Sequence, residues 1–272
     1  MADSAPLICK DIHKTFDQLE VLKGISLETK KGDVVSLIGS SGSGKSTFLR
    51  CVNMLETPTS GDIIVHGDPI RFTTNRKGER IPADNKQVEL IRARLSMVFQ
   101  SFNLWSHMTV LENIIEAPIH VLKVPRKEAI ERAEAYLEKV GIYERKDYYP
   151  AQMSGGQQQR VAIARVLVQD PEVILADEPV SSVDPSLAES IIKLLVAISE
   201  ETHKTLLVNL HSTALALSNF PRVIGMKAGV KLFDSTATAV TPELLRQLYS
   251  DDAPLGVTSQ PFHESENRRT SI

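Results

Sequence analysis

The stretch from Gly39 to Thr47 combines small residues with one lysine in a pattern suited to phosphate binding. It reads Gly-Ser-Ser-Gly-Ser-Gly-Lys-Ser-Thr and matches G-x-x-x-x-G-K-[ST]. Small residues let consecutive backbone N–H groups turn inward around a phosphate, and a following helix adds its positive N-terminal end. Lys45 is expected to contact the β- and γ-phosphates, and Ser46 to offer a hydroxyl to Mg²⁺. The candidate nucleotide-binding residues here are Gly39, Ser40, Ser41, Gly42, Ser43, Gly44, Lys45, Ser46 and Thr47.

Both flanks of this stretch favour a strand, a loop and a helix in that order. Val34 to Ile38 is a short apolar run suited to a buried strand, and Phe48 to Val52 continues as a helix. The alternative is a Gly/Ser turn that contains a lysine by chance. Because that alternative does not account for the full pattern together with its flanks, we favour a phosphate-binding loop.

An acidic pair follows a second apolar run. Val173 to Ala176 predicts a buried strand, and Asp177-Glu178 comes directly after it. Acids at the C-terminal end of a parallel strand face the ligand crevice of an open α/β sheet. Downstream of a phosphate-binding loop, we expect Asp177 to hold Mg²⁺ and Glu178 to act on the attacking water. Two solvated loop acids are the alternative.

Two further features are weak when taken alone. Ser154-Gly155-Gly156-Gln157 leads into a helix expected from Gln158, and by itself it indicates only a helix N-cap with a flexible approach, although backbone N–H groups there could also meet an anion. Phe16 is a lone aromatic residue at a strand end, where a partly buried packing residue is the ordinary interpretation.

The rest of the chain predicts the elements that position these residues. Strands at 7–15 and 21–29 form an antiparallel element before the loop. Helical spacing of apolar residues runs from 109 to 141, with interruptions at Pro118 and Pro125. Further expected elements are strands at 63–65, 96–99, 173–176 and 205–210, a surface hairpin or loop insertion at 72–85, a hairpin at 225–234, and helices at 86–95, 158–168, 185–199 and 242–249.

This order of elements predicts an α/β fold. We expect a P-loop NTPase core with an N-terminal antiparallel β element and an inserted α-helical subdomain at about 101–168. The domain is expected to span residues 1–250. Residues 251–272 are polar with little apolar content, which predicts a disordered tail.

Length and composition are typical of one large α/β domain. The 272 residues suffice for a full core, and a net charge of −3 disfavours nucleic acid as the main partner. No run of about 18 apolar residues occurs and the N-terminus lacks a signal-peptide layout, so we expect the chain to stay in the cytosol. Cys9 and Cys51 stand in apolar segments without metal-type spacing, which predicts buried, inert thiols.

Several of these features occur together in a fixed order along the chain. That order is the phosphate-binding loop, the strand end at Gln100, Met-Ser-Gly-Gly-Gln, Leu-Ala-Asp-Glu-Pro, Ser-Ser-Val-Asp and the strand-end His211. It resembles the ATP-binding subunits of ABC transporters over roughly residues 7 to 250. The Ser-Gly-Gly-Gln element is specific to this family among P-loop proteins.

The resemblance implies roles that residue types alone do not assign. It implies that Phe16 stacks on adenine, that Gln100 senses Mg²⁺ and the membrane partner, and that His211 lies near the γ-phosphate. It makes Glu178 the general base and Asp184 a dimer contact. The implied signature loop, which binds nucleotide from the opposite chain, is Ser154, Gly155, Gly156 and Gln157.

The resemblance also implies how the protein works. It implies an ABC ATPase that binds ATP and Mg²⁺ and acts as a head-to-tail homodimer at the cytoplasmic face of the cell membrane. The implied partners are integral membrane permease subunits and, indirectly, a substrate-binding protein. Two non-importer alternatives remain: a soluble ABC ATPase of translation or DNA repair, and a regulatory module that does not hydrolyse ATP. The first usually has two cassettes or a long coiled coil, and intact Lys45, Glu178 and His211 disfavour the second.

The chain departs from the family pattern in two places and is uneven in its subfamily likeness. Met153 replaces the usual Leu, and 177–184 reads Asp-Glu-Pro-Val-Ser-Ser-Val-Asp instead of Asp-Glu-Pro-Thr-Ser-Ala-Leu-Asp.

Residues 10–170 are similar to ATPases of histidine and other polar amino-acid importers, whereas residues from 173 onward are more similar to those of phosphonate importers. We therefore expect a polar or basic amino-acid importer ATPase, with phosphonate import as the alternative and a mosaic origin as one explanation.

Overall fold

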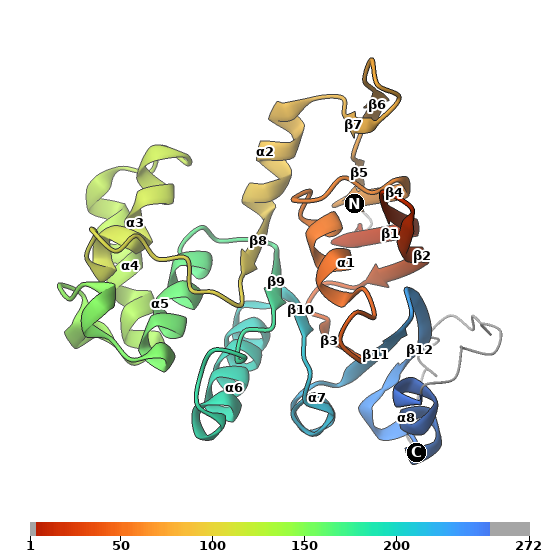
Figure 1. Cartoon of the computed structure of the whole chain (residues 1–272). Helices are drawn as coiled ribbons and strands as arrows, with labels where there is room; N and C mark the ends of the chain where they lie inside the picture. Colours follow the sequence, from red (N-terminus) through yellow and green to blue (C-terminus); the bar gives the residue numbers. More distant parts are fainter. Residues whose placement is uncertain (1–3, 251–272) are drawn as a thin grey trace, which may run out of the picture.

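A six-stranded sheet runs through the centre of the fold and carries the candidate site at one edge (Figure 1). The structure is a computed structural model that describes residues 4–250. Within the sheet all neighbours are parallel except the antiparallel pair β11–β12. In spatial order its strands are β12 (Val230–Thr236), β11 (Arg222–Lys227), β3 (Val34–Ile38), β10 (Thr205–Asn209), β9 (Val173–Asp177) and β8 (Leu95–Val98).

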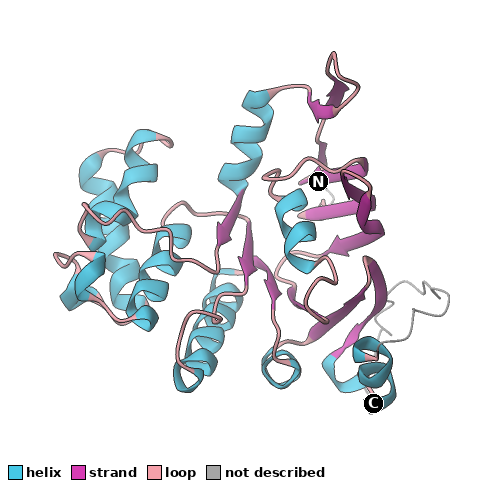
Figure 2. Ribbon diagram, in the orientation of Figure 1, coloured by secondary structure: helices cyan, strands magenta, loops and turns pink. Residues whose placement is uncertain are grey.

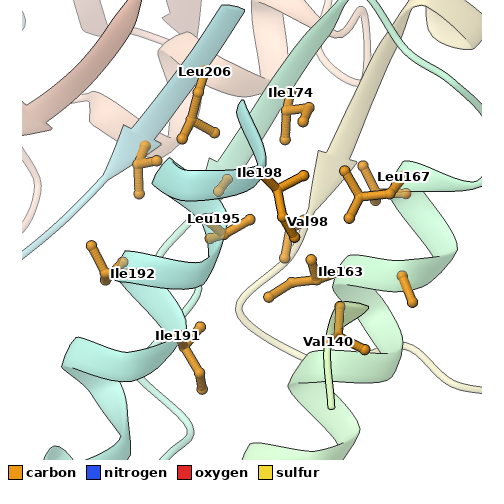
Figure 3. Close-up of a cluster of buried hydrophobic side chains, with 14 of the residues drawn as sticks. Val98, Val140, Ile163, Leu167, Ile174, Ile191, Ile192, Leu195, Ile198 and Leu206 are labelled. Atoms are coloured by element: carbon orange, nitrogen blue, oxygen red, sulfur yellow. The ribbon is translucent and has the colours of Figure 1, made fainter. Parts of the chain in front are cut away.

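Both faces of this sheet are covered, which explains why its central strands read as unbroken buried runs. Every residue of β3, β9 and β10 is buried. Successive side chains of a strand point to opposite faces. Ile174 and Leu206 accordingly join the core beneath helices α5 (Gly155–Leu167) and α6 (Pro185–Thr202), as Figure 3 shows.

The opposite face packs on a second core that includes the N-terminal strands. An antiparallel sheet in the order β2-β1-β4-β5 lies there, with helix α1 (Lys45–Val52) between it and the central sheet. Cys9 and Cys51 are buried free thiols, as expected, and burial raises the pKa of Cys51 to about 12. The strand bounds are β1 (Leu7–Phe16), β2 (Leu19–Thr29), β4 (Ser60–Val65) and β5 (Asp68–Pro69).

Three helices pack on one another beside β8, away from the strand-rich part of the chain (Figure 2). They are α3 (Val110–His120), α4 (Arg126–Lys139) and α5. Thr109 begins α3 with a capping box that includes Glu112. Pro118 does not interrupt α3, contrary to the sequence expectation, because it lies in the last turn and the helix continues to His120. Pro125 does mark a boundary, as the N-cap of α4.

The other elements agree with the predictions in kind and differ mainly at their ends. The hairpin expected at 72–85 is β6 (Phe72–Thr74) with β7 (Arg80–Pro82), followed by α2 (Asn85–Arg94). Helix α5 begins at Gly155, three residues earlier than expected, since Ser154 is its N-cap. Short 3-10 turns lie at 143–145, 150–152 and 237–239, and α8 (Pro242–Tyr249) ends the described part.

One helix was missed, and one prediction lies outside the description. No element was expected between His211 and the hairpin at 225–234, where helix α7 (Thr213–Asn219) is found. The predicted disorder of 251–272 falls on residues outside the described range. No helix among residues 4–250 is long and apolar enough to cross a lipid bilayer.

Candidate nucleotide-binding site

The predicted phosphate-binding loop folds around a small cavity where β3 meets α1. The cavity has a volume of about 150 Å³. Its lining combines the loop with one residue of β2 and two residues that follow neighbouring strands: Val21, Ser41, Gly42, Ser43, Gly44, Lys45, Ser46, Thr47, Glu178 and His211. The structure therefore brings the loop, the acidic pair and the strand-end histidine together, as the sequence order predicts.

Glycine is required at two points of the loop by close backbone contacts. A Cβ atom at Gly39 would lie 2.0 Å from the carbonyl oxygen of Met226. Gly44, the N-cap of α1, has φ 99°, and a Cβ atom there would lie 3.0 Å from the carbonyl oxygen of Val21. These contacts exclude a side chain at either position and so fix the path of the backbone beside the cavity.

Lys45 lies at the base of the loop. Its Nζ atom donates to the carbonyl oxygens of Gly39 at 2.8 Å and Ser40 at 2.9 Å, and to Ser43 Oγ at 3.3 Å. Burial lowers the pKa of Lys45, while the nearby carboxylates of Glu178 and Asp177 oppose that shift. The ammonium group is thus held by neutral oxygens next to the cavity, where a phosphate is a stronger partner.

Ser46, Asp177 and Asn209 form a hydrogen-bonded group on one side of the cavity. Ser46 Oγ donates to Asp177 Oδ1 at 2.7 Å, and Asn209 Nδ2 donates to the same oxygen at 2.7 Å and to Ser46 Oγ at 3.0 Å. Asn209 is fully buried, and its Oδ1 atom has no hydrogen-bond partner in the described part of the chain. The group brings together a carboxylate and a hydroxyl oxygen, which are ligand types that suit Mg²⁺, and the Asn209 amide orients both by donating to them.

Asn209 is a site residue that was not predicted from the sequence. It is the last residue of β10, and the signal was one amide in an otherwise apolar run. Parallel strands bring equivalent ends to the same edge of a sheet, and Asn209 pairs in register with Asp177. The strand pairing therefore explains why an amide at this position meets the acidic pair.

Glu178 and His211 face each other at the cavity. His211 Nε2 lies 2.6 Å from Glu178 Oε1, and the two side chains are 48% and 16% exposed, respectively. Glu178 follows β9 with φ 50°, and its backbone N–H donates to the carbonyl oxygen of Asn209 at 3.2 Å. This turn directs the Glu178 side chain into the cavity, where a carboxylate and an imidazole can share a proton or orient a water molecule.

The other predicted site residues lie elsewhere in the described structure and do not line this cavity. Phe16 is 40% exposed at the end of β1, with Lys14 Nζ 4.5 Å from its ring centroid. Asp184 is the exposed N-cap of α6. Gln100 is exposed just after β8, and its carbonyl oxygen accepts a hydrogen bond from Ser182 Oγ at 3.1 Å. Their functional roles stay predictions.

The predicted signature loop forms the N-terminus of α5. Ser154 and Gln157 make a reciprocal capping box, in which Gln157 Oε1 accepts from the Ser154 N–H at 2.9 Å. A Cβ atom at Gly155 would lie 3.0 Å from the carbonyl oxygen of Ser182, and one at Gly156 would lie 2.8 Å from Leu187 Cδ1. The two glycines therefore let the start of α5 pack closely against the segment that follows the acidic pair.

Known proteins are similar to this chain in both sequence and fold. The family model described as "ABC transporter" matches residues 22–181. The chain is 56% identical over 207 residues to the arginine/ornithine transport ATP-binding protein AotP of Pseudomonas aeruginosa, covering 76% of this chain and 81% of that protein. It is 52% identical over 220 residues to the histidine/lysine/arginine/ornithine transport ATP-binding protein HisP of Escherichia coli, covering 80% and 85%.

Solved structures agree with the sequence relatives. The fold matches cbiO1 from Clostridium perfringens, a part of the ABC transporter complex cbiONQ, with a TM-score of 0.76, 29% identity, and 90% of this chain and 94% of that chain covered. It also matches a dimeric ATP-binding cassette in a post-hydrolysis state bound to ADP and Pi, with a TM-score of 0.73, 33% identity, and coverage of 85% and 98%. This chain belongs to the ABC transporter family, among its ATP-binding subunits.

Proposed function

We propose that this chain is the ATP-hydrolysing subunit of an importer for polar or basic amino acids, with histidine as the first candidate substrate. The observation that carries the hydrolytic part is the Glu178–His211 pair at the phosphate-loop cavity. The amino-acid part rests on relatives such as AotP and HisP, which are more than half identical to this chain over most of its length.

Hydrolysis needs a water molecule aligned with the γ-phosphate and stabilisation of the charge that develops there. Glu178 is the proposed general base that accepts the proton of this water. His211, in contact with Glu178, orients the carboxylate and the water. Lys45 and the N–H groups of the loop bind the phosphate oxygens, so most of the rate enhancement comes from positioning and electrostatics.

The oxygen atoms beside the loop fit Mg²⁺. Ser46 Oγ and Asp177 Oδ1 lie 2.7 Å apart beside the cavity, and Asn209 Nδ2 holds both in place by donating a hydrogen bond to each. Held by these residues, Mg²⁺ would supply positive charge that offsets the negative charge of the phosphate groups. Gln100 is the proposed additional ligand, contributed from the segment after β8.

The signature loop is proposed to complete the site of a second copy. In a head-to-tail homodimer, Ser154, Gly155, Gly156 and Gln157 of one chain cover the nucleotide held by the loop of the other. The N-terminus of α5 suits this role, because free N–H groups and the helix dipole favour an anion. Asp184 would contact the partner across the interface, and Phe16 would stack on adenine. Support comes from the matched cassette structure, which is dimeric.

A permease is proposed to dock on the helical subdomain at 101–168 and the segment after Gln100. A groove of about 340 Å³ lies there, with Phe99, Asn103 and Trp105 in its lining. Arg165 of α5 fixes this segment, because its guanidinium donates to the carbonyl oxygens of Asn103 at 2.6 Å and Phe102 at 2.9 Å. Docking would place the subunit peripherally at the cytoplasmic face of the membrane, with the substrate-binding protein contacting only the permease.

Co-expression with two permeases tests this assignment. The chain should co-purify with a histidine or arginine importer permease and show ATP hydrolysis stimulated by the loaded binding protein. Trp105→Glu should abolish co-purification, because it puts a charge into the apolar part of the groove. Leu90→Glu is the matched control, since Leu90 is 67% exposed on α2, outside both the helical subdomain and the groove lining.

The phosphonate importer is the competing assignment, and the residues from Val173 onward favour it. Assembly only with a phosphonate permease would overturn the amino-acid proposal and would show that the C-terminal third dictates pairing. Assembly with neither permease, together with normal ATP hydrolysis, would instead favour a soluble ABC ATPase.

A further inference from the structure

The end of β11 and the turn that leads to β12, together residues 226–229 and called the β11–β12 turn here, contact the phosphate-binding loop. The backbone N–H of Gly229 donates to the carbonyl oxygen of Ser43 at 3.2 Å. The carbonyl oxygen of Met226 lies so close to Gly39 that a Cβ atom there would come within 2.0 Å of it. Met226 itself is fully buried. Gly39 and Ser43, at the two ends of this loop segment, therefore both contact the β11–β12 turn.

The same turn is tied to the C-terminal helix by one buried lysine. Lys227 is 9% exposed, and its Nζ atom donates to the carbonyl oxygen of Gln247 at 2.7 Å and to Ser250 Oγ at 2.8 Å. These acceptors lie in the last turn and the C-cap of α8. A cation at the C-terminal end of a helix satisfies unpaired carbonyl groups and interacts favourably with the helix dipole.

The turn has little freedom to absorb movement between these two contacts. The carbonyl oxygen of Gly229 accepts from the backbone N–H of Lys23 at 2.8 Å, and a Cβ atom at Gly229 would lie 2.5 Å from the carbonyl oxygen of Val21. Ala228 has φ 48°, a left-handed conformation that non-glycine residues rarely adopt. A displacement at Lys227 should therefore reach the loop and Val21, which lines the cavity.

We propose that Lys227 is a positioning residue that couples the end of helix α8 to the phosphate-binding loop, so that the docking of α8 sets the affinity for ATP. This gives the C-terminal helix a regulatory role that the hydrolysis mechanism does not require. A partner or modification that pulls the end of α8 away from Lys227 would weaken nucleotide binding without touching the nucleotide. The proposal rests on the proposed ATP site.

Equilibrium binding of a fluorescent ATP analogue to Lys227→Met tests the coupling. The methionine keeps most of the side-chain volume and removes the ammonium group, and we expect the Kd to rise about fivefold, as is typical of coupling between sites. Lys231→Met is the matched control in the same hairpin, because this lysine pairs with Asp234 of its own strand, and it should keep the wild-type Kd. Lys227→Arg, which retains the cation, should bind close to wild type.

The outcomes separate this inference from the ATP site itself. A wild-type chain that does not bind ATP would refute the proposed function. A folded Lys227→Met chain with the wild-type Kd, or an equal loss in Lys231→Met, would overturn the coupling.

Hydrogen exchange on the wild-type chain gives a second test that needs no variant. Coupling is reciprocal, so ATP should slow amide exchange at 244–250 if the loop and α8 are linked. Unchanged exchange at 244–250 on saturation with ATP would overturn the proposal, even if Lys227→Met fails to fold.

Discussion

Replacing Asn113 should loosen the segment that carries the proposed permease contact. Asn113 is fully buried in the first turns of α3. Its Nδ2 atom donates to the carbonyl oxygens of Trp105 at 3.1 Å, Met108 at 3.1 Å and Thr109 at 2.9 Å, and its Oδ1 atom accepts from the Trp105 N–H at 2.8 Å. One side chain thus holds the whole turn from 105 to 109.

The magnitude follows from these four contacts. The two N–H hydrogens of the amide are shared among three carbonyl oxygens, so the four contacts amount to about three hydrogen bonds of about 1 kcal/mol net each. Asn113→Ala should therefore lower the free energy of unfolding by about 2–4 kcal/mol. For a chain of this size, that corresponds to a decrease in Tm of roughly 5–10 °C. Trp105, which is 42% exposed, should become more exposed as the turn opens.

Trp105 also provides the assay, because it is the only tryptophan in the chain. Acrylamide should quench its fluorescence more strongly in Asn113→Ala than in wild type. Asn113→Asp should be worse still, because its buried carboxylate would face the carbonyl oxygens that the amide now binds. Unchanged quenching with a loss below about 0.5 kcal/mol, the level typical of surface substitutions, would refute this account of the turn.

Three further predictions concern the nucleotide site. Glu178→Gln should bind ATP but lose most turnover and accumulate as an ATP-stabilised dimer on size-exclusion chromatography, since the amide keeps the volume but not the base; near-normal hydrolysis would exclude Glu178 as the base. Lys45→Ala should weaken ATP binding itself, measured by calorimetry, because the lost charge contacts phosphate in both ground and transition states; an unchanged Kd would contradict this. Asn209→Leu should raise the Mg²⁺ concentration needed for half-maximal hydrolysis about tenfold by removing the support of Asp177 and Ser46, and an unchanged Mg²⁺ dependence would argue against that role.

The sequence was most informative where chemistry depends on consecutive residues. The loop from Gly39 to Thr47 and the pair Asp177-Glu178 are each continuous in the chain, and the buried strands before them could be recognised from apolar runs. Their meeting at one cavity followed from the rule that parallel strands end at the same sheet edge. The structure places them there.

Residues that act across the chain were harder to find. Asn209 meets Asp177 because β10 and β9 pair in register, and a single amide in an apolar run does not predict that pairing. Helix α7 is short and contains one buried side chain, Ala216, so no apolar periodicity marks it. Lys227 contacts residues twenty or more positions away, and such a contact cannot be predicted from the residues next to it in the sequence.

Complementation between two inactive variants tests the central claim, that two chains share each ATP site. Lys45→Ala disables the chain's own phosphate loop, whereas Ser154→Arg should spare ATP binding by its own chain and block the site of the opposite one. In a mixed dimer, one site receives both defects and the other receives neither. Mixing the two inactive variants should therefore restore ATP hydrolysis at one intact site per mixed dimer. If the mixture stays as inactive as either variant alone while mixed dimers form, the head-to-tail arrangement is wrong.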